Sequence, residues 1–152
     1  MDFEEYHRAY FAQPQPPGRF QFRDAFGTTL YYEDYPDAAA FYERVLGPPN
    51  YLEGDSTRGW RIGSGWLTLL RGKKGNPRNV EITLELAKPE QAEALQRAFI
   101  SAGAEGQAAS DQLMYRPVRT CPVVDPFGLE IMIIAPLKLD QRGIEKPPNQ
   151  SL

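Results

Sequence analysis

The sequence contains few of the residues on which several common functions depend. Its 152 residues include one cysteine and one histidine, and no apolar run approaches the length that spans a membrane. One cysteine cannot form a disulfide within the chain, which suits a reducing compartment. The net charge of -3 argues against nucleic acid as a partner, because phosphate binding needs a basic face. The short basic run at 71–74 lies beside turn residues and is interpreted as a solvated loop.

The N-terminal residues do not have the pattern of a secretory signal. MDFEEYHR is acidic, whereas a signal begins with basic residues and continues with apolar ones. We therefore expect a cytoplasmic protein without a membrane partner. A hydrophobic content of 41% and a charged content of 24% are typical of a globular protein. This length suits one domain with its own hydrophobic core.

A strand, a helix and further strands are predicted twice along the chain. Thr28–Asp34 is predicted to be a strand and Pro36–Leu46 a helix, and Val80–Leu86 and Pro89–Ala102 repeat that order. Each helix begins with proline and an acid, which suit a first turn, and a glycine follows each helix. Further strand-like runs come after each helix, within Tyr51–Arg71 and Leu113–Ile134.

Two motifs within this repeat resemble the vicinal oxygen chelate superfamily, which includes glyoxalase I, extradiol dioxygenases and bleomycin-binding proteins. FYERVLG, at 41–47, resembles its helix-end signature, and DPFG, at 125–128, resembles its last hairpin. The resemblance implies an α+β fold of two βαβββ modules, whose curled mixed sheets enclose a shared cavity. It covers residues 27–136, with module one at about 27–73 and module two at about 79–136. Residues 137–152 are then expected to form a flexible tail.

Residues 1–26 are predicted to form an extension, a short helix followed by a proline-rich linker. Phe3, Tyr6, Tyr10 and Phe11 recur at helical spacing, and QPQPPG follows them. An aromatic stripe needs a covering surface, either from the domain itself or from a second subunit. Members of the superfamily often complete their cavities as homodimers, so the resemblance implies a homodimer here.

The metal site of the superfamily is not matched by this sequence. The metal-dependent members bind a divalent cation through His and Glu or Gln, and their ligand positions correspond to Gly27, Asn79 and Met132 or their close neighbours. Glycine has no side chain, and a thioether is a poor ligand for a hard cation. The only histidine, His7, lies in the extension. We therefore expect no usual metal site and no cofactor.

Two carboxylates leave a displaced site open. Glu81 and Glu130 are the candidate catalytic residues, as ligands of a divalent metal or as an acid and a base. The alternative is that Glu81 is a solvated residue on a half-exposed sheet face. Cys121 lies in a predicted strand with no histidine nearby, and is interpreted as a small buried hydrophobe.

Alternation along the strands predicts which side chains face the cavity. Trp60 and Trp66 could line it or lie in the core or a dimer interface. Aromatic faces beside a few acids suit a flat or cationic organic molecule. The predicted ligand-binding residues are Thr29, Tyr31, Trp66, Thr68, Glu81, Thr83, Tyr115, Glu130 and Met132.

The sequence therefore favours a protein that resembles bleomycin-binding proteins and holds a small aromatic or cationic molecule without a metal. One alternative is a metal-dependent lyase, isomerase or dioxygenase-like enzyme that uses Glu81 and Glu130. Another is a dimeric interaction module without a small-molecule ligand. The residues alone leave open whether the protein is an enzyme.

Overall fold

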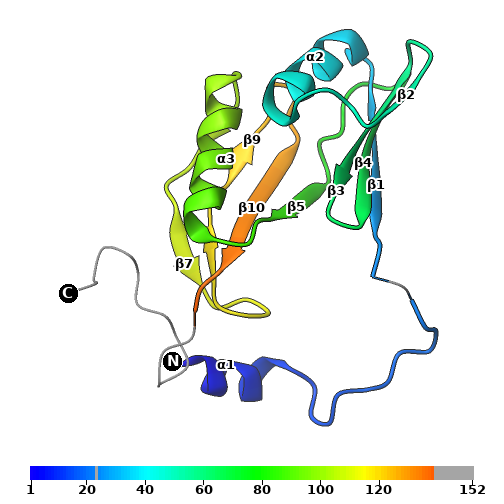
Figure 1. Cartoon of the computed structure of the whole chain (residues 1–152). Helices are drawn as coiled ribbons and strands as arrows, with labels where there is room; N and C mark the ends of the chain where they lie inside the picture. Colours follow the sequence, from blue (N-terminus) through cyan, green and yellow to red (C-terminus); the bar gives the residue numbers. More distant parts are fainter. Residues whose placement is uncertain (23, 139–152) are drawn as a thin grey trace.

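The computed structural model describes residues 1–22 and 24–138 as an α+β fold with two sheets (Figure 1). The greater part of the predicted tail, residues 139–152, lies outside the described residues. The first sheet has the order β1-β4-β3-β2, in which β1 and β4 are parallel. Its strands are β1 (Gly27–Tyr32), β2 (Tyr51–Glu53), β3 (Thr57–Ile62) and β4 (Gly65–Arg71).

The second sheet repeats this arrangement around its longest strand. In it β10 pairs in parallel with β5 and antiparallel with β8 and β9, just as β4 pairs with β1 and β3 in the first sheet. The predicted repeat of strand, helix and strands is thus present. The strands are β5 (Glu81–Glu85), β6 (Glu105–Gly106), β7 (Ser110–Gln112), β8 (Val118–Thr120), β9 (Val123–Val124) and β10 (Glu130–Pro136).

The strands of the second half are shorter than the sequence predicts. Pro122 separates β8 from β9 because it has no N–H to donate to a neighbouring strand. The side-chain amide of Gln96 donates to the carbonyls of Gln107 and Pro122, at 2.7 and 3.1 Å. These two carbonyls therefore have a hydrogen-bond donor where the pairing of the strands is interrupted. Tyr115, which was expected on a strand, lies in the turn between β7 and β8, where Met114 has a φ of 48°.

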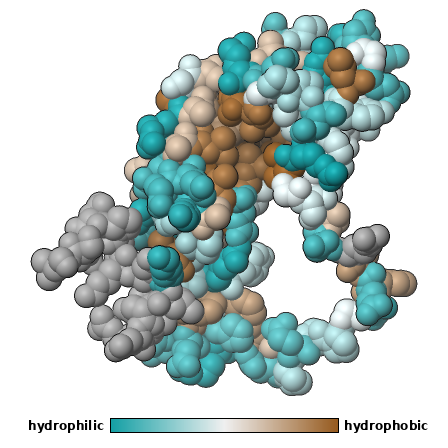
Figure 2. All heavy atoms as spheres, in the orientation of Figure 1, coloured by the Kyte–Doolittle hydropathy of each residue, from teal (hydrophilic) through white to brown (hydrophobic). Residues whose placement is uncertain are grey.

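Two helices cover the sheets and meet between them. α2 (Tyr35–Leu46) packs on β1 and β4, and α3 (Pro89–Ser101) packs on β10. Proline lies in the first turn of both helices, and Gly47 ends α2 with a φ of 86°, as predicted. Figure 2 shows apolar side chains gathered where the two helices and β10 come together. Among the described residues, no helix is long and apolar enough to cross a membrane.

The carboxylate of Asp125, in the DPFG turn, joins the two halves of the chain. It is 4% exposed, and its Oδ2 accepts hydrogen bonds from the hydroxyls of Tyr32 and Tyr42, at 2.9 and 2.8 Å. Its Oδ1 accepts the backbone N–H groups of Phe127 and Leu129, at 2.9 and 2.8 Å. A buried carboxylate with four donors is well satisfied, so Asp125 stabilises the fold.

This cluster predicts a loss of stability at alkaline pH. Burial, with the nearby Asp125 charge, raises the pKa of both Tyr32 and Tyr42, so the folded chain retains both protons. An unfolded tyrosine releases its proton near pH 10, so each tyrosine lowers the free energy of unfolding by about 1.4 kcal/mol per pH unit above that point. Tyr42→Phe should therefore lose stability less steeply than the wild type in urea titrations from about pH 9 to about pH 11.5. Parallel curves would contradict this assignment.

The extension contains the predicted helix, α1 (Phe3–Tyr10), which Asp2 caps through the backbone N–H of Glu5. None of the residues of α1 is buried by the described part of the chain. Figure 1 shows α1 below the second sheet, and a long connection that leads from it to β1 of the first sheet. Phe11 contacts the ring of Tyr115 edge-on. The homodimer that would cover the aromatic stripe stays a prediction.

Candidate functional site

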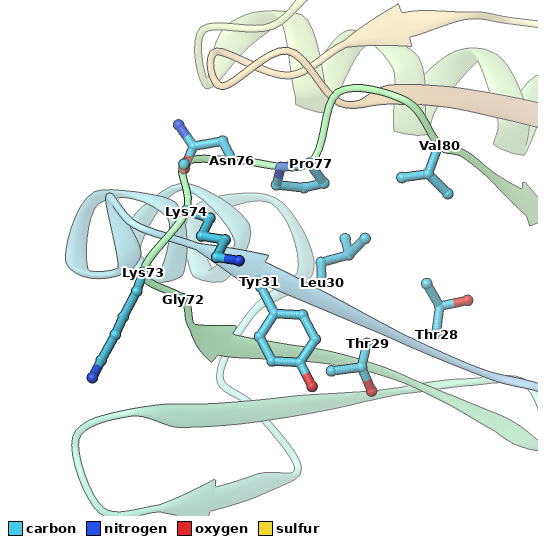
Figure 3. Close-up of a pocket in the computed structure, with 11 residues that line it drawn as sticks. Thr28, Thr29, Leu30, Tyr31, Gly72, Lys73, Lys74, Asn76, Pro77 and Val80 are labelled. Atoms are coloured by element: carbon cyan, nitrogen blue, oxygen red, sulfur yellow. The ribbon is translucent and has the colours of Figure 1, made fainter.

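A cleft of about 620 Å³ lies beside β1 (Figure 3). Residues 28–31 of β1 form one wall of it. The opposite wall is the connection between the two halves of the chain, residues 72–77 together with Val80. This volume lies in the range of pockets that bind small organic molecules.

Hydrogen bonds hold the connection against the end of β1. Gly72 donates its N–H to the carbonyl of Tyr32 at 2.9 Å, and Glu33 donates to the carbonyl of Gly75 at 3.0 Å. A Cβ at position 72 would lie 2.8 Å from the Cβ of Tyr31, so glycine is required for this close approach. The side-chain amide of Asn76 donates to Asp34 at 3.1 Å. The wall opposite β1 is therefore fixed on both sides of the two lysines at 73 and 74.

The two walls of this cleft differ in chemistry. Tyr31 is 56% exposed, and its ring and the hydroxyl of Thr29 lie on the β1 side. Lys74 extends from the connection toward β1, whereas Lys73 points away from it (Figure 3). Val80 adds an apolar side chain at the far end of the connection. The cleft thus combines aromatic, apolar and cationic groups, and none of the described residues that line it carries a carboxylate.

A second cleft, of about 330 Å³, lies between the hairpin of β3 and β4 and strand β5. It contains two predicted site residues, Trp66 and Thr83, beside Phe26 and Glu85. The guanidinium carbon of Arg61 lies 4.8 Å from the centre of the Trp66 ring. A cation of this protein is therefore already in contact with one face of the Trp66 ring.

Four of the five remaining predicted ligand-binding residues lie on the exposed faces of the two sheets. Thr68 is the register partner of Thr29 on the first sheet. On the second sheet Glu130 is next to Glu81, and Met132 is next to Thr83. Tyr115 lies apart, in its turn, and is 84% exposed. The structure thus distributes the predicted residues over two clefts and two sheet faces, and their contact with a ligand stays a prediction.

The positions that the resemblance assigns to a metal do not fit one. Gly27 offers no side chain, and Met132 lies half-buried beside Thr83. His7 stacks on Phe11 within the extension. In residues 1–22 and 24–138, no three His, Cys, Asp or Glu side chains come together as metal ligands.

The remaining candidates are structural. Cys121 is fully buried, and burial raises the pKa of its thiol, which confirms the prediction of an inert buried residue. Of the two tryptophans, Trp60 lies in the core and donates its indole N–H to the carbonyl of Gly47 at 2.8 Å. Trp66 is the tryptophan that lines a cleft.

The amino-acid sequence alone does not identify the connection as part of a site. Residues 71–74 were interpreted as a solvated loop, yet residues 72–74 line the cleft beside Tyr31. Glycines at 72 and 75 were a local signal that the backbone turns here. They did not show that the turn brings Lys74 back against β1, because that depends on the hydrogen bonds to Tyr32 and Glu33.

The comparisons with known proteins concern the fold. No protein-family model matches the sequence. No curated protein matches it either. Among solved structures, a glyoxalase/bleomycin resistance protein from Albidiferax ferrireducens T118 is similar, with a TM-score of 0.63 and 16% identity over 72% of this chain and 96% of that one.

Two further similar structures carry related descriptions. A glyoxalase/bleomycin resistance protein/dioxygenase family enzyme from Burkholderia phytofirmans PsJN has a TM-score of 0.58 and 16% identity, over 73% of this chain and 97% of its own. A lactoylglutathione lyase from Agrobacterium tumefaciens has a TM-score of 0.57 and 15% identity, over 79% of this chain and 95% of its own. The chain therefore has the fold of the glyoxalase/bleomycin resistance/dioxygenase proteins, the superfamily that its FYERVLG and DPFG motifs resemble.

Proposed function

We propose that this protein binds a small aromatic molecule, without a metal, in the cleft beside β1. The observation that carries the proposal is the exposed ring of Tyr31 on the wall of a cleft of about 620 Å³. A large aromatic side chain loses apolar contact when it is left open to water, and a flat ligand would restore that contact. Further apolar surface in the cleft comes from Pro77 and Val80 on the connection, and from Leu30 on the other side of β1 from Tyr31 (Figure 3).

The cleft favours an aromatic ligand over a cationic one. Its charged side chains are those of Lys73 and Lys74, which would repel a cation. The acids expected beside the aromatic residues, Glu81 and Glu130, lie on the second sheet and do not line this cleft. Bleomycin resistance proteins among the structures of similar fold support the general idea of a small-molecule ligand.

A displaced carboxylate site is the second candidate, and one observation favours it. Glu81 and Glu130 are register partners on β5 and β10, so two carboxylates lie side by side on an exposed face. Such a pair could bind a divalent cation together with water molecules, or could share a proton. Only two acids meet at this point in the register, which is a smaller donor set than most oxygen sites use.

Removal of the Tyr31 ring tests the main proposal. A panel of aromatic compounds is titrated against the protein in the presence of a chelator, with calorimetry as the measurement. Tyr31→Ala is expected to weaken the binding of any compound that binds the wild type by about 10-fold. The reason is that a stacked ring contributes about 1 kcal/mol beyond its buried area. Tyr31→Phe should keep most of the affinity.

Tyr10→Ala is the matched control, because this tyrosine is 70% exposed, lies in α1 and does not line the cleft. Its affinity should equal that of the wild type. Equal affinity of Tyr31→Ala and the wild type would contradict the proposal, and so would binding that the chelator abolishes.

A further inference from the structure

The cleft beside β1 has a positive charge on the wall that faces the strand bearing Tyr31. In Figure 3 the side chain of Lys74 reaches from the connection toward β1, on the side where Tyr31 lies. We propose that the ligand of this cleft is an aromatic carboxylate, with its anionic group bound by the ammonium group of Lys74 and its ring lying on Tyr31. This inference rests on the proposed function and names the class of ligand.

The position of Lys74 is set by the backbone on both sides of it. Gly72 is bonded to Tyr32, and Gly75 accepts a hydrogen bond from Glu33. Between these two bonds the connection has little freedom, and one lysine is directed inward while its neighbour, Lys73, is directed outward. Because the backbone is held in this way, binding has to order only the side chain of Lys74, which costs less conformational entropy than ordering a lysine on a free loop.

The charge of Lys74 is available to a ligand. Within the described ranges, Lys74 takes part in no ion pair, although other basic side chains such as Arg116 and Arg119 do. In the part of the chain that the structure describes, no aspartate or glutamate lines the cleft, and the carboxylate of Asp34, beside the connection, is hydrogen-bonded to Asn76. The hydroxyl of Thr29, on the same side of β1 as Tyr31, also lines the cleft and can donate to a carboxylate oxygen (Figure 3).

The distribution of charge over the two sheets also favours an anionic ligand in the cleft beside β1. The exposed face of the second sheet presents the paired acids Glu81 and Glu130, which would repel an anion. The cleft beside β1 presents lysines instead. An aromatic anion would therefore be repelled by one sheet and attracted to the cleft of the other.

Three probes with one ring system and different charges test this inference on the full chain. They are naphthoate, naphthalenemethanol and naphthylmethylamine. The wild type is expected to bind naphthoate about 10-fold more tightly than the alcohol, because an ion pair in an open cleft contributes on the order of 1 kcal/mol. The amine should bind most weakly. Raising the salt concentration should weaken the binding of naphthoate and leave that of the alcohol unchanged.

Substitution of the lysine separates charge from shape. Lys74→Gln should reduce the naphthoate affinity to that of the alcohol, a loss of about 10-fold, and leave the affinity for the alcohol unchanged. Lys74→Arg should retain the preference for the acid. Lys88→Ala, at an exposed lysine that precedes α3 and lies outside the cleft, is the control and should bind all three probes as the wild type does.

The outcomes distinguish this inference from the proposed function. Equal affinities for the acid and the alcohol, both weakened by Tyr31→Ala, would overturn the anionic ligand and leave the aromatic one in place. A preference for the acid that persists in Lys74→Gln would also overturn the role of this lysine. Absence of binding by all three probes at concentrations up to their solubility would contradict both.

Discussion

Replacement of Asp125 by alanine is expected to lower the free energy of unfolding by about 3–4 kcal/mol. The carboxylate lies in the interior and accepts four hydrogen bonds, from the hydroxyls of Tyr32 and Tyr42 and from two backbone N–H groups. Alanine would leave these donors buried without their acceptor. The loss should appear as a lower midpoint of urea unfolding.

Substitution by asparagine separates the contribution of the two backbone N–H groups from that of the two tyrosine hydroxyls. Asp125→Asn keeps an oxygen for the N–H groups of Phe127 and Leu129 and replaces the oxygen that the tyrosine hydroxyls use, so a loss of about 1–2 kcal/mol is expected. Asp37→Ala, at an exposed acid in the first turn of α2, is the control and should cost less than about 1 kcal/mol. If Asp125→Ala were as stable as this control, Asp125 would not join the two halves.

Phe41→Ala is expected to lower the free energy of unfolding by about 3–5 kcal/mol. Phe41 is 1% exposed, and its ring packs against the rings of Tyr42, Phe99 and Phe127. These contacts connect α2 with α3 and with the DPFG turn. Truncation would leave a cavity at the centre of this cluster, because rings held by two helices and a turn cannot move far enough to fill it.

Phe22→Ala is the matched control for this substitution, because its side chain is 88% exposed. It removes the same atoms from a position that buries almost none of them, so a change below about 0.5 kcal/mol is expected. Thermal unfolding of the two variants beside the wild type is the measurement. Similar losses in both would show that Phe41 is not central to the core.

The sequence predicted the elements of the fold well because their signals are local. Proline in the first turn and a glycine at the end defined α2 and α3 to within a residue or two. The DPFG turn was visible from four adjacent residues. Alternation correctly placed Tyr31 on the face of β1 away from the core, and its neighbours Leu30 and Tyr32 are buried on the other face.

The candidate site was predicted less completely because it depends on contacts between distant segments. Strand alternation gives the face of a residue but not the neighbour across the cleft, so Tyr31 was identified and Lys74 was not. Trp60 and Trp66 lie in adjacent strands with similar local sequence, and only the packing of Trp60 against α2 distinguishes them. Tyr115 was misplaced because a turn interrupts its apolar surroundings.

The position of a bound aromatic molecule is the most direct test of the account. Amide resonances of the isotopically labelled protein are followed while naphthoate is added in the presence of a chelator. Binding beside β1 should shift the resonances of residues 28–31 and 72–76 and leave those around Glu81 and Glu130 unchanged. Shifts confined to those two glutamates, or shifts that require an added divalent cation, would contradict a metal-free aromatic site in this cleft.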